Sequence, residues 1–501
     1  MDELREVAQS DQTVELSLDE LGHLPADVLQ PRYDRSDLAP GIVHIGVGNF
    51  HRAHQAWYLH RLMQDGEALD WAIVGAGVRA GDAVMRNKLL AQDCLTTLIE
   101  LRPDGRSAEI TGSMIGFIPV EENNASLISQ IAEPSTRIVS LTVTEGGYYI
   151  QPATGAFDAS HPDIVHDVAH PAEPRSAFGA IVAALSKRRR SGAGPVTIQS
   201  CDNLQGNGDI TRQTVVSLAR ANDPDLASWI DGECSFPNSM VDCIVPATGA
   251  NEIAEARRFG IEDAAPVTHE NFRQWVIEDD FCAGRPAWDK VGATFTDRVH
   301  DYETMKIRIL NAGHQVLANP GELLGCATIA DCMADARIAA YFAKVQQTEI
   351  VPYVRPVPGM TPGDYAVLIG QRFANPAIRD TTRRVAFDGA TRHTGFLLPI
   401  LRDALAAGGP VDGLALVEAL WARMCAGTRE DGSVIEPNDP DWTNLQRAAL
   451  AARERPRAWI GQENIYGDLA TDPRFASAFD HWLGMIWKDG VALALTTFAS
   501  D

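Results

Sequence analysis

The sequence lacks the features that mark secreted, membrane-spanning and metal-clustering proteins. Its eight cysteines are scattered without a C-x-x-C pair, which argues against a disulfide framework or a zinc knuckle and favours a reducing compartment. No apolar run approaches membrane-spanning length. The segment from Met1 to Glu20 is acidic and polar, unlike a signal or transit peptide. We therefore expect a soluble cytoplasmic protein.

Positive charge is also scarce, with 43 Lys and Arg against 67 Asp and Glu and a formal net charge of -24. Nucleic acids and anionic membranes both require a basic face, so neither is an expected partner. The composition is 45% hydrophobic and 22% charged, which is typical of a globular protein. Because 501 residues exceed one ordinary core, we expect two domains.

The first part of the chain alternates between short apolar runs and helical patterns. Such alternation predicts an α/β, Rossmann-type domain with a mostly parallel sheet, over residues 1–297. Helices are expected between the strands, for example at Ala53–Met63 and Arg175–Arg188. The expected strands are Gly41–Gly48, Trp71–Val78, Arg137–Thr144 and Pro195–Ser200.

After about Val299 the pattern becomes predominantly helical, which predicts a helical substrate and catalytic domain over residues 298–501. Four prolines between Pro352 and Pro362 indicate one long loop. The expected helices are Tyr302–Leu317, Asp335–Glu349, Thr394–Ala407, Gly413–Cys425 and Arg474–Trp487.

The first expected strand runs into the turn Gly46-Val-Gly48-Asn-Phe-His51, which has two of the three glycines of G-x-G-x-x-G. The first glycine allows a tight turn, and the second lets the backbone approach a pyrophosphate at a helix N-terminus. Alone, the motif fits a plain structural turn about as well. Its position after the first strand of an α/β pattern favours dinucleotide binding. Arg52 and His54 are either surface residues or positive charge near the phosphate.

No acidic residue stands at the end of the second strand, where one would bind the adenosine ribose. Asp82 is the nearest candidate, while Arg79 could accept a 2′-phosphate. We predict NAD as the cofactor, and NADP is not excluded. The residues expected to contact it are Gly46, Gly48, Asn49, Phe50, Arg52 and Asp82.

The segment from Tyr302 to His314 places three polar side chains on one partly apolar helix face. At about 100° per residue, Asn311 and His314 fall about 140° and about 80° from Lys306. A lone lysine is more often solvated, but three polar groups among apolar neighbours indicate a partly buried site. A buried lysine can serve as a base, and an asparagine amide can stabilise an oxyanion. Glu303 either tunes Lys306 or forms a surface ion pair with it.

The spacing Tyr302-x-x-x-Lys306 also fits the Tyr/Lys pair of short-chain dehydrogenases. The glycine pattern of that family is absent here, so we treat the match as coincidence.

Several segments resemble those of the polyol-specific long-chain dehydrogenases, in that family's order and over nearly the whole chain. The resemblance is strongest to members that act on mannitol. It implies a monomer that interconverts a sugar alcohol and a ketose, with mannitol and fructose as the first pair, by hydride transfer without a metal. The segments are Gly46–His54, Thr142–Tyr148, Ser200–Gly208, Phe236–Asp242 and Lys306–His314.

The resemblance also implies roles for single residues. Lys306 would be the general acid/base, and Asn203 and Asn311 would form the oxyanion hole. Glu145 would lie on a proton path from Lys306, as a further catalytic residue beside Glu303. The substrate would be bound by His314, Asp242 and Arg384. From the residue pattern alone, Asn203 also fits a turn former and Asp242 a turn cap, and for Arg384 the pattern favours a surface charge.

One position departs from the mannitol-specific pattern, because Arg392 stands where those members carry lysine. An arginine suits a carboxylate, so Arg392 is a substrate-binding candidate and reduction of a keto sugar acid such as fructuronate or tagaturonate stays an alternative. Oxidation of D-arabinitol is another alternative. A dinucleotide-binding sensor without turnover is a third, against which the set of Lys306, Asn311 and His314 argues.

Overall fold

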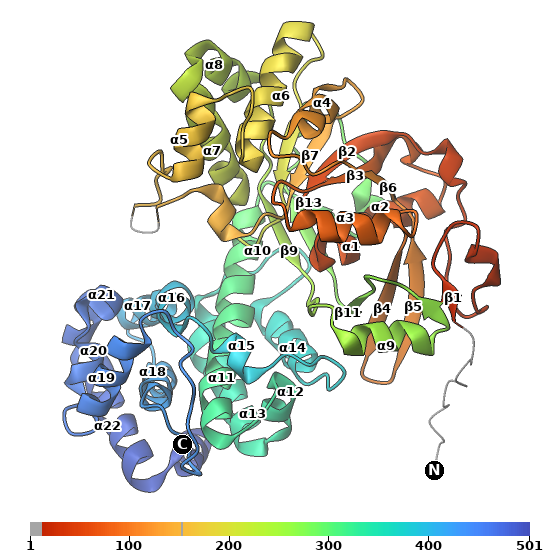
Figure 1. Cartoon of the computed structure of the whole chain (residues 1–501). Coiled ribbons are helices and arrows are strands. Elements are labelled where there is room, and N and C mark those ends of the chain that lie inside the picture. The colour runs from red at the N-terminus through yellow and green to blue at the C-terminus, as the bar shows by residue number, and fades with distance from the viewer. Residues whose placement is uncertain (1–12, 152–153, 501) are drawn as a thin grey trace. The chain divides into compact units, whose positions relative to one another are not determined.

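The structure, a computed structural model, describes residues 13–151 and 154–500 and divides into two units, Met1–His300 and Asp301–Asp501 (Figure 1). The polar segment Met1–Glu20 lies partly outside the described residues. Among the residues that are described, no helix is long and apolar enough to cross a membrane.

Five parallel strands form the central sheet of the first unit, in the order β6-β3-β2-β7-β8. Their side chains are mostly buried, as expected for parallel strands covered on both faces, and in β8 this includes the polar Thr197, Gln199 and Ser200. In chain order the strands read 3-2-1-4-5, so the winding reverses between β2 and β7. The strands are β2 (Pro40–Ile45), β3 (Ala72–Ala76), β6 (Met114–Phe117), β7 (Ile138–Leu141) and β8 (Thr197–Ser200).

Helices cover both faces of this sheet. Val43 and Ile45 of β2 belong to one core, and Ile42 belongs to the other. The first core contains α4 (Ala125–Ala132), α6 (Ala177–Ser191), α7 (Asn207–Asn222) and α8 (Pro224–Glu233), and the second contains α2 (Gln55–Gln64). The remaining helices of this unit are α1 (Asn49–Ala53), α3 (Asp82–Leu90), α5 (Pro162–Ala169) and α9 (Ala250–Arg258). The Rossmann-type sheet expected from the sequence is confirmed.

The first unit also contains short strands that the sequence analysis did not predict. One sheet has the order β11-β4-β5 and another the order β13-β12-β9, and each mixes parallel with antiparallel pairing. These strands are β4 (Thr96–Arg102), β5 (Gly105–Thr111), β9 (Ser239–Asp242), β11 (Val267–Glu270), β12 (Gln274–Ile277) and β13 (Thr294–Phe295). A small parallel pair joins β1 (Val14–Glu15) to β10 (Ile261–Glu262).

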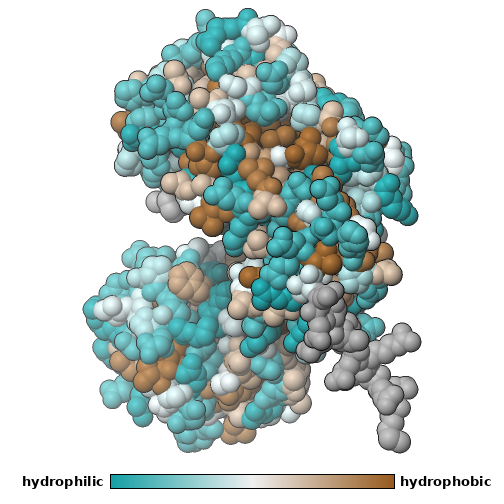
Figure 2. Space-filling view, turned by 45° about the vertical axis from the view of Figure 1, so that its right-hand side comes forward, coloured by the Kyte–Doolittle hydropathy of each residue, from teal (hydrophilic) through white to brown (hydrophobic). Residues whose placement is uncertain are grey.

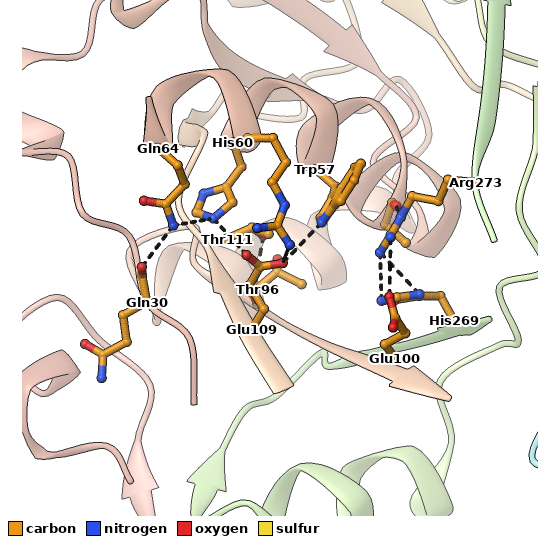
Figure 3. Close-up of polar contacts among 12 residues, drawn as sticks. Gln30, Trp57, His60, Gln64, Thr96, Glu100, Glu109, Thr111, His269 and Arg273 are labelled. Carbon is orange, nitrogen blue, oxygen red and sulfur yellow. Dashed lines mark hydrogen bonds and ion pairs between the residues drawn. The ribbon is translucent and has the colours of Figure 1, made fainter. Parts of the chain in front are cut away.

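Polar contacts attach the β11-β4-β5 sheet to α2 (Figure 3). The carboxylate of Glu109 on β5 accepts hydrogen bonds from Trp57 Nε1 at 3.1 Å and Arg61 Nη2 at 2.9 Å. The Arg273 guanidinium lies 4.0 Å from the centre of the Trp57 ring, and its Nη2 is 2.8 Å from His269 Nε2. These directional contacts fix where the second sheet meets the helix, because each loses strength when its geometry changes.

The second unit is helical, as expected. Its centre is α18 (Asp412–Cys425), which is buried along almost its whole length and packs against α11 (Ala312–Leu324) and α22 (Pro473–Asp489). The other longer helices are α13 (Ala336–Val345), α14 (Pro362–Phe373), α17 (Leu398–Ala407), α19 (Trp442–Ala452) and α23 (Val491–Ser500). Short ones are α12 (Ile329–Ala334), α15 (Thr382–Val385), α16 (Gly389–Arg392), α20 (Arg457–Ile460) and α21 (Glu463–Tyr466).

Three helical segments of the second unit have π-helical hydrogen bonding. They are η6 (Lys306–Asn311), η7 (Gln346–Ile350) and η9 (His393–Leu397). The first joins α10 (Val299–Met305) to α11, so the single α-helix expected at Tyr302–Leu317 is interrupted.

The face seen in Figure 2 is predominantly hydrophilic, with apolar residues gathered over part of the first unit. Large apolar side chains that are exposed, such as Val84 and Val434, occur in both units.

Candidate active site and dinucleotide site

The glycine turn follows β2 at the point where the winding of the sheet reverses. Gly46 has φ = 95°, and a Cβ there would lie 2.2 Å from the Thr142 carbonyl oxygen after β7, so only glycine fits. Gly48 is exposed, and a Cβ there would have the Gly46 oxygen at 3.9 Å as its one described neighbour within 4 Å. The backbone at Gly48 is therefore open to a ligand.

Arg52 supports this turn from inside. Its side chain is fully buried, and it donates to the carbonyls of Gly48 and Ala265 and, at 2.8 Å, to Asn49 Oδ1. Burial lowers the pKa of Arg52 to about 10. His54 is also buried, and its ring stacks on that of Phe50. The hypothesis that Arg52 and His54 are surface residues is therefore wrong.

A cavity of about 370 Å³ lies beside the glycine turn. Asn49, Met85 and Lys88 line it together with residues 245–248. Asp82 begins the helix that carries Met85 and Lys88, and its Oδ2 accepts hydrogen bonds from the Val78 and Arg79 amides, both at 2.9 Å. Its carboxylate thus reaches back to the end of β3, where a dinucleotide-binding fold uses an acidic group.

Two predicted catalytic residues follow neighbouring strands of the central sheet. Glu145 begins the short helix η4 (Glu145–Tyr148) after β7, and Asn203 follows β8. Both are exposed. Because the carboxyl ends of parallel strands meet at one edge, both belong to the edge that carries the glycine turn. Asp242, a predicted substrate ligand, is buried at the end of β9.

Asp202 ties these strand ends together, and the sequence analysis missed it. Its carboxylate accepts hydrogen bonds from the Val143 amide at 2.9 Å, the Thr144 amide at 3.0 Å and the Tyr148 hydroxyl at 2.7 Å. Burial raises the pKa of Asp202 above its ordinary value. Asp202 therefore fixes the backbone immediately before Glu145 and immediately before Asn203.

Asn207 performs a similar task between β8 and β9. Its buried amide accepts from the Ser239 N–H at 2.8 Å, and donates to the carbonyls of Ser239 at 2.8 Å and Asp202 at 3.0 Å. The motif Asp-Asn-Leu-x-Gly-Asn contains this residue, but its partner lies 32 residues away in the chain. The contact places Asp242, three residues after Ser239, relative to Asn203.

In the second unit, Lys306 and Glu303 are both buried, with 7% and 4% of their surface exposed. The hypothesis of a surface ion pair for Glu303 is therefore wrong. Asn311 is half-buried. The Ala312 N–H bonds back to the Ile307 carbonyl, five residues earlier, as in a π-helix.

This register corrects the angle predicted for Asn311. In an α-helix Asn311 would stand about 140° around the axis from Lys306. With bonds that span five residues, positions five apart lie about one turn from each other. Lys306 and Asn311, the ends of η6, therefore share a side of the helix more closely than predicted.

His314 lies on α11 and stacks on Phe373, with ring centres 4.3 Å apart. Its Nε2 is 3.7 Å from Asp380, whose carboxylate accepts two 2.6 Å hydrogen bonds from Arg384. Burial lowers the pKa of His314 to about 4, so the imidazole is neutral near neutral pH. Arg384 is 61% exposed but paired, and Arg392 ends α16 half-buried.

Among the described residues, no group of three or more His, Cys, Asp or Glu side chains is arranged to hold a metal ion. Metal independence of the reaction stays a prediction.

A doubly wound sheet with a glycine turn at its reversal point, followed by a helical unit with a buried lysine, defines a dinucleotide-dependent oxidoreductase. Residues 40–290 match the mannitol dehydrogenase Rossmann domain family, and residues 298–487 match the mannitol dehydrogenase C-terminal domain family. The chain belongs to the mannitol dehydrogenase family, which confirms the resemblance of its motifs.

Curated relatives match nearly the whole chain. It is 55% identical over 471 residues to mannitol 2-dehydrogenase of Cereibacter sphaeroides, covering 94% of this chain and 98% of that protein. Mannitol 2-dehydrogenase of Phaeosphaeria nodorum is 37% identical over 492 residues, covering 97% and 86%.

Solved structures show the same fold. The ternary complex of Pseudomonas fluorescens mannitol 2-dehydrogenase with NAD and D-mannitol has a TM-score of 0.86 and 39% identity, and the match covers 97% of this chain and 100% of that one. A D-sorbitol dehydrogenase in substrate-free form has a TM-score of 0.89 and 33% identity, covering 96% and 100%.

Proposed function

We propose that this protein is an NAD-dependent polyol dehydrogenase that interconverts D-mannitol and fructose. The relative at 55% identity is a mannitol 2-dehydrogenase, and the Pseudomonas fluorescens structure contains NAD and D-mannitol. The observation on this chain that carries the proposal is the burial of Lys306 in a π-helical turn that ends at Asn311.

In this proposal residues 1–297 form the dinucleotide-binding domain. The open backbone at Gly48 and the cavity beside Asn49 fit a pyrophosphate and an adenosine. Phe50 borders the turn, and Arg52 holds it in shape. The Asp82 carboxylate would hydrogen-bond the adenosine ribose, which favours NAD over NADP.

Residues 298–501 would supply the catalytic base. When bound, NAD accepts the hydride. Lys306 takes the proton from the reacting hydroxyl, and its burial keeps competing water away. Asn203 and Asn311 each donate an amide hydrogen bond to the oxygen as negative charge develops on it. In the reverse direction Lys306 returns the proton to the ketose oxygen.

Other side chains would move the proton and orient the polyol. Glu303, one turn before Lys306, and Glu145, exposed after β7, can pass the proton on to water. Asp242 can accept hydrogen bonds from substrate hydroxyls. Neutral His314 offers one donor and one acceptor, which suits a hydroxyl group.

The arginines bear on the choice between a polyol and a keto sugar acid. Arg384 and Arg392 would both contact substrate, and two cations would suit a carboxylate. Arg384, however, is paired through Nε and Nη2 with the Asp380 carboxylate, which offsets its charge. This pairing weakens the case for a carboxylate substrate and favours the uncharged polyol over fructuronate or tagaturonate.

The test compares kcat/KM for D-mannitol and D-arabinitol with NAD and with NADP, and for fructuronate with NADH, before and after dialysis against EDTA. We expect the highest value for mannitol with NAD and no effect of EDTA. Activity on the uronate alone would overturn the proposal. Binding of NADH without oxidation of any polyol would identify a sensor, and a loss of activity that zinc restores would contradict the metal-free mechanism.

A further inference from the structure

The π-helical turn that carries Lys306 is packed against a second π-helical segment. In the second unit η6 contacts both η7 and η9. Gln346 is the first residue of η7, and only 2% of its surface is exposed. π-Helical turns are rare and are frequently found at functional sites. Their contact raises the question of what keeps η6 out of the more stable α-helical register.

The side chain of Gln346 enters the hydrogen-bond pattern of η6 directly. Its Nε2 donates to the Ile309 carbonyl at 2.8 Å. The Ala312 N–H is shared between the carbonyls of Ile307 and Ile309. The amide of Gln346 thus supplies the Ile309 carbonyl with a donor while the Ala312 N–H reaches the carbonyl five residues back.

The sequence of η6 and α11 makes room for this amide at Gly313. A Cβ on Gly313 would lie 2.6 Å from Gln346 Nε2, which is too close for a real contact, and 3.2 Å from the Phe342 ring, which is tight. Gly313 lies inside a helix, where glycine is less favourable than alanine. The glycine is therefore accounted for by the space that the glutamine amide occupies.

Packing alone does not explain a glutamine at this position. Among the described residues its Oε1 has no hydrogen-bond partner, although the side chain is buried. An apolar side chain of the same volume would avoid that cost, since replacing a partly satisfied buried amide can be neutral or stabilising. What only the amide provides is the donor to Ile309.

We propose that Gln346 is a positioning residue that holds η6 in the π-helical register and so keeps Lys306 and Asn311 one turn apart on the same side of the helix. Without the donor, η6 can tighten towards α-helical bonding, which turns Asn311 away from Lys306. The inference rests on the proposed function, in which these two groups act on one oxygen atom.

The main variant is Gln346→Met, which keeps the volume and removes the donor. We expect kcat for mannitol oxidation to fall about 10- to 100-fold, the scale expected for a misplaced catalytic group. KM for mannitol and the Kd for NADH should stay close to wild type. The pH profile of kcat should move, because the surroundings of the Lys306 amine change. The melting temperature should stay or rise.

Glu349→Gln is the matched control. Glu349 is buried in the same segment η7, but its carboxylate accepts from the amides of Gly413 and Leu414 at 2.7 and 2.8 Å, away from η6. This variant should lower the melting temperature and leave kcat and its pH profile unchanged. Gly313→Ala is the second test variant, because its methyl group displaces the Gln346 amide, and it should reproduce the fall in kcat.

A Gln346→Met enzyme with wild-type kcat and pH profile would overturn the inference. So would a loss of kcat that merely follows a loss of thermal stability, as a structural role predicts. If Gln346→Met does not accumulate as folded protein, Gly313→Ala decides in the same way. If Lys306→Ala stays active, the proposed function has failed. If Lys306→Ala is inactive while Gln346→Met is normal, only the positioning role has failed.

Discussion

Lys306 is 7% exposed, on a helix where the neighbouring Ile309 and Leu310 are also buried. Lysines are almost never buried without a partner or a task. His314, two turns on, is neutral near neutral pH because burial lowers its pKa to about 4. The group that takes the proton must therefore be another than His314, and in the proposed mechanism it is Lys306.

We expect Lys306→Ala to lower kcat about 10²- to 10⁴-fold, the contribution usual for a general acid/base. NADH binding, measured by fluorescence titration, should be nearly unchanged, because Lys306 lies outside the dinucleotide-binding unit. A loss of NADH affinity as large as the loss of kcat would mean that the lysine is structural.

The residues proposed to carry the reactive groups belong to short sequence motifs, whereas the contacts that hold them in place could not be predicted from the sequence. Lys306, Asn311 and His314 stand within one helical segment. Asp202 and Gln346 act through partners that are 54 and 37 residues away, on Tyr148 and Ile309. A local sequence pattern cannot predict such contacts, because they form only in the tertiary fold.

Whether a strand or a helix could be predicted depended on its length and on the period of its apolar residues. Four strands of the central sheet were predicted because each is a short segment with apolar residues in a repeating α/β pattern. The four-residue strands β9, β11 and β12 are stabilised by pairing that the sequence does not display. The turn Pro103-Asp-Gly105 between β4 and β5 was the missed signal for a hairpin. The π-helical segments could not be predicted, because the apolar periodicity of a sequence is interpreted with the 3.6 residues per turn of an α-helix.

Packing between elements gives a prediction at Gly208 in α7. A Cβ there would lie 2.4 Å from the Phe236 carbonyl oxygen and 2.6 Å from the Asn238 nitrogen, and neither backbone atom can move easily. We expect Gly208→Ala to lower the free energy of unfolding by about 1–3 kcal/mol. Gly484→Ala in α22 is the control, since no described atom lies within 4 Å of its Cβ position.

Both variants would be compared by urea unfolding. The control should be as stable as wild type or more stable by about 0.5–1 kcal/mol, because alanine favours the helix. Equal stability of the two variants would mean that α7 can shift away from residues 236–238.

At the scale of the whole molecule, the net charge bears on how copies of the chain approach one another. The formal net charge of -24 opposes close approach of two chains at low ionic strength. The division into an α/β unit and a helical unit could be predicted from the change in periodicity near Val299. The oligomeric state came from the family resemblance alone, because a single sequence shows no partner surface.

We predict a monomer of 54.3 kDa in size-exclusion chromatography with light scattering, with or without NADH. The measurement should be repeated at low and high salt, because salt screens the repulsion between chains. A mass about twice as large at both salt concentrations would contradict the prediction.

The π-helical turn at Lys306–Asn311 has a consequence for redesign of this enzyme. The wide turn of η6 depends on the number of residues between Lys306 and Asn311. Deleting one residue would remove the residue that the wide turn accommodates and restore α-helical bonding, so the present five-residue spacing of Lys306 and Asn311 would be lost. Substrate preference can therefore be altered here by exchanging side chains, while changes in chain length belong in the loops outside this helix.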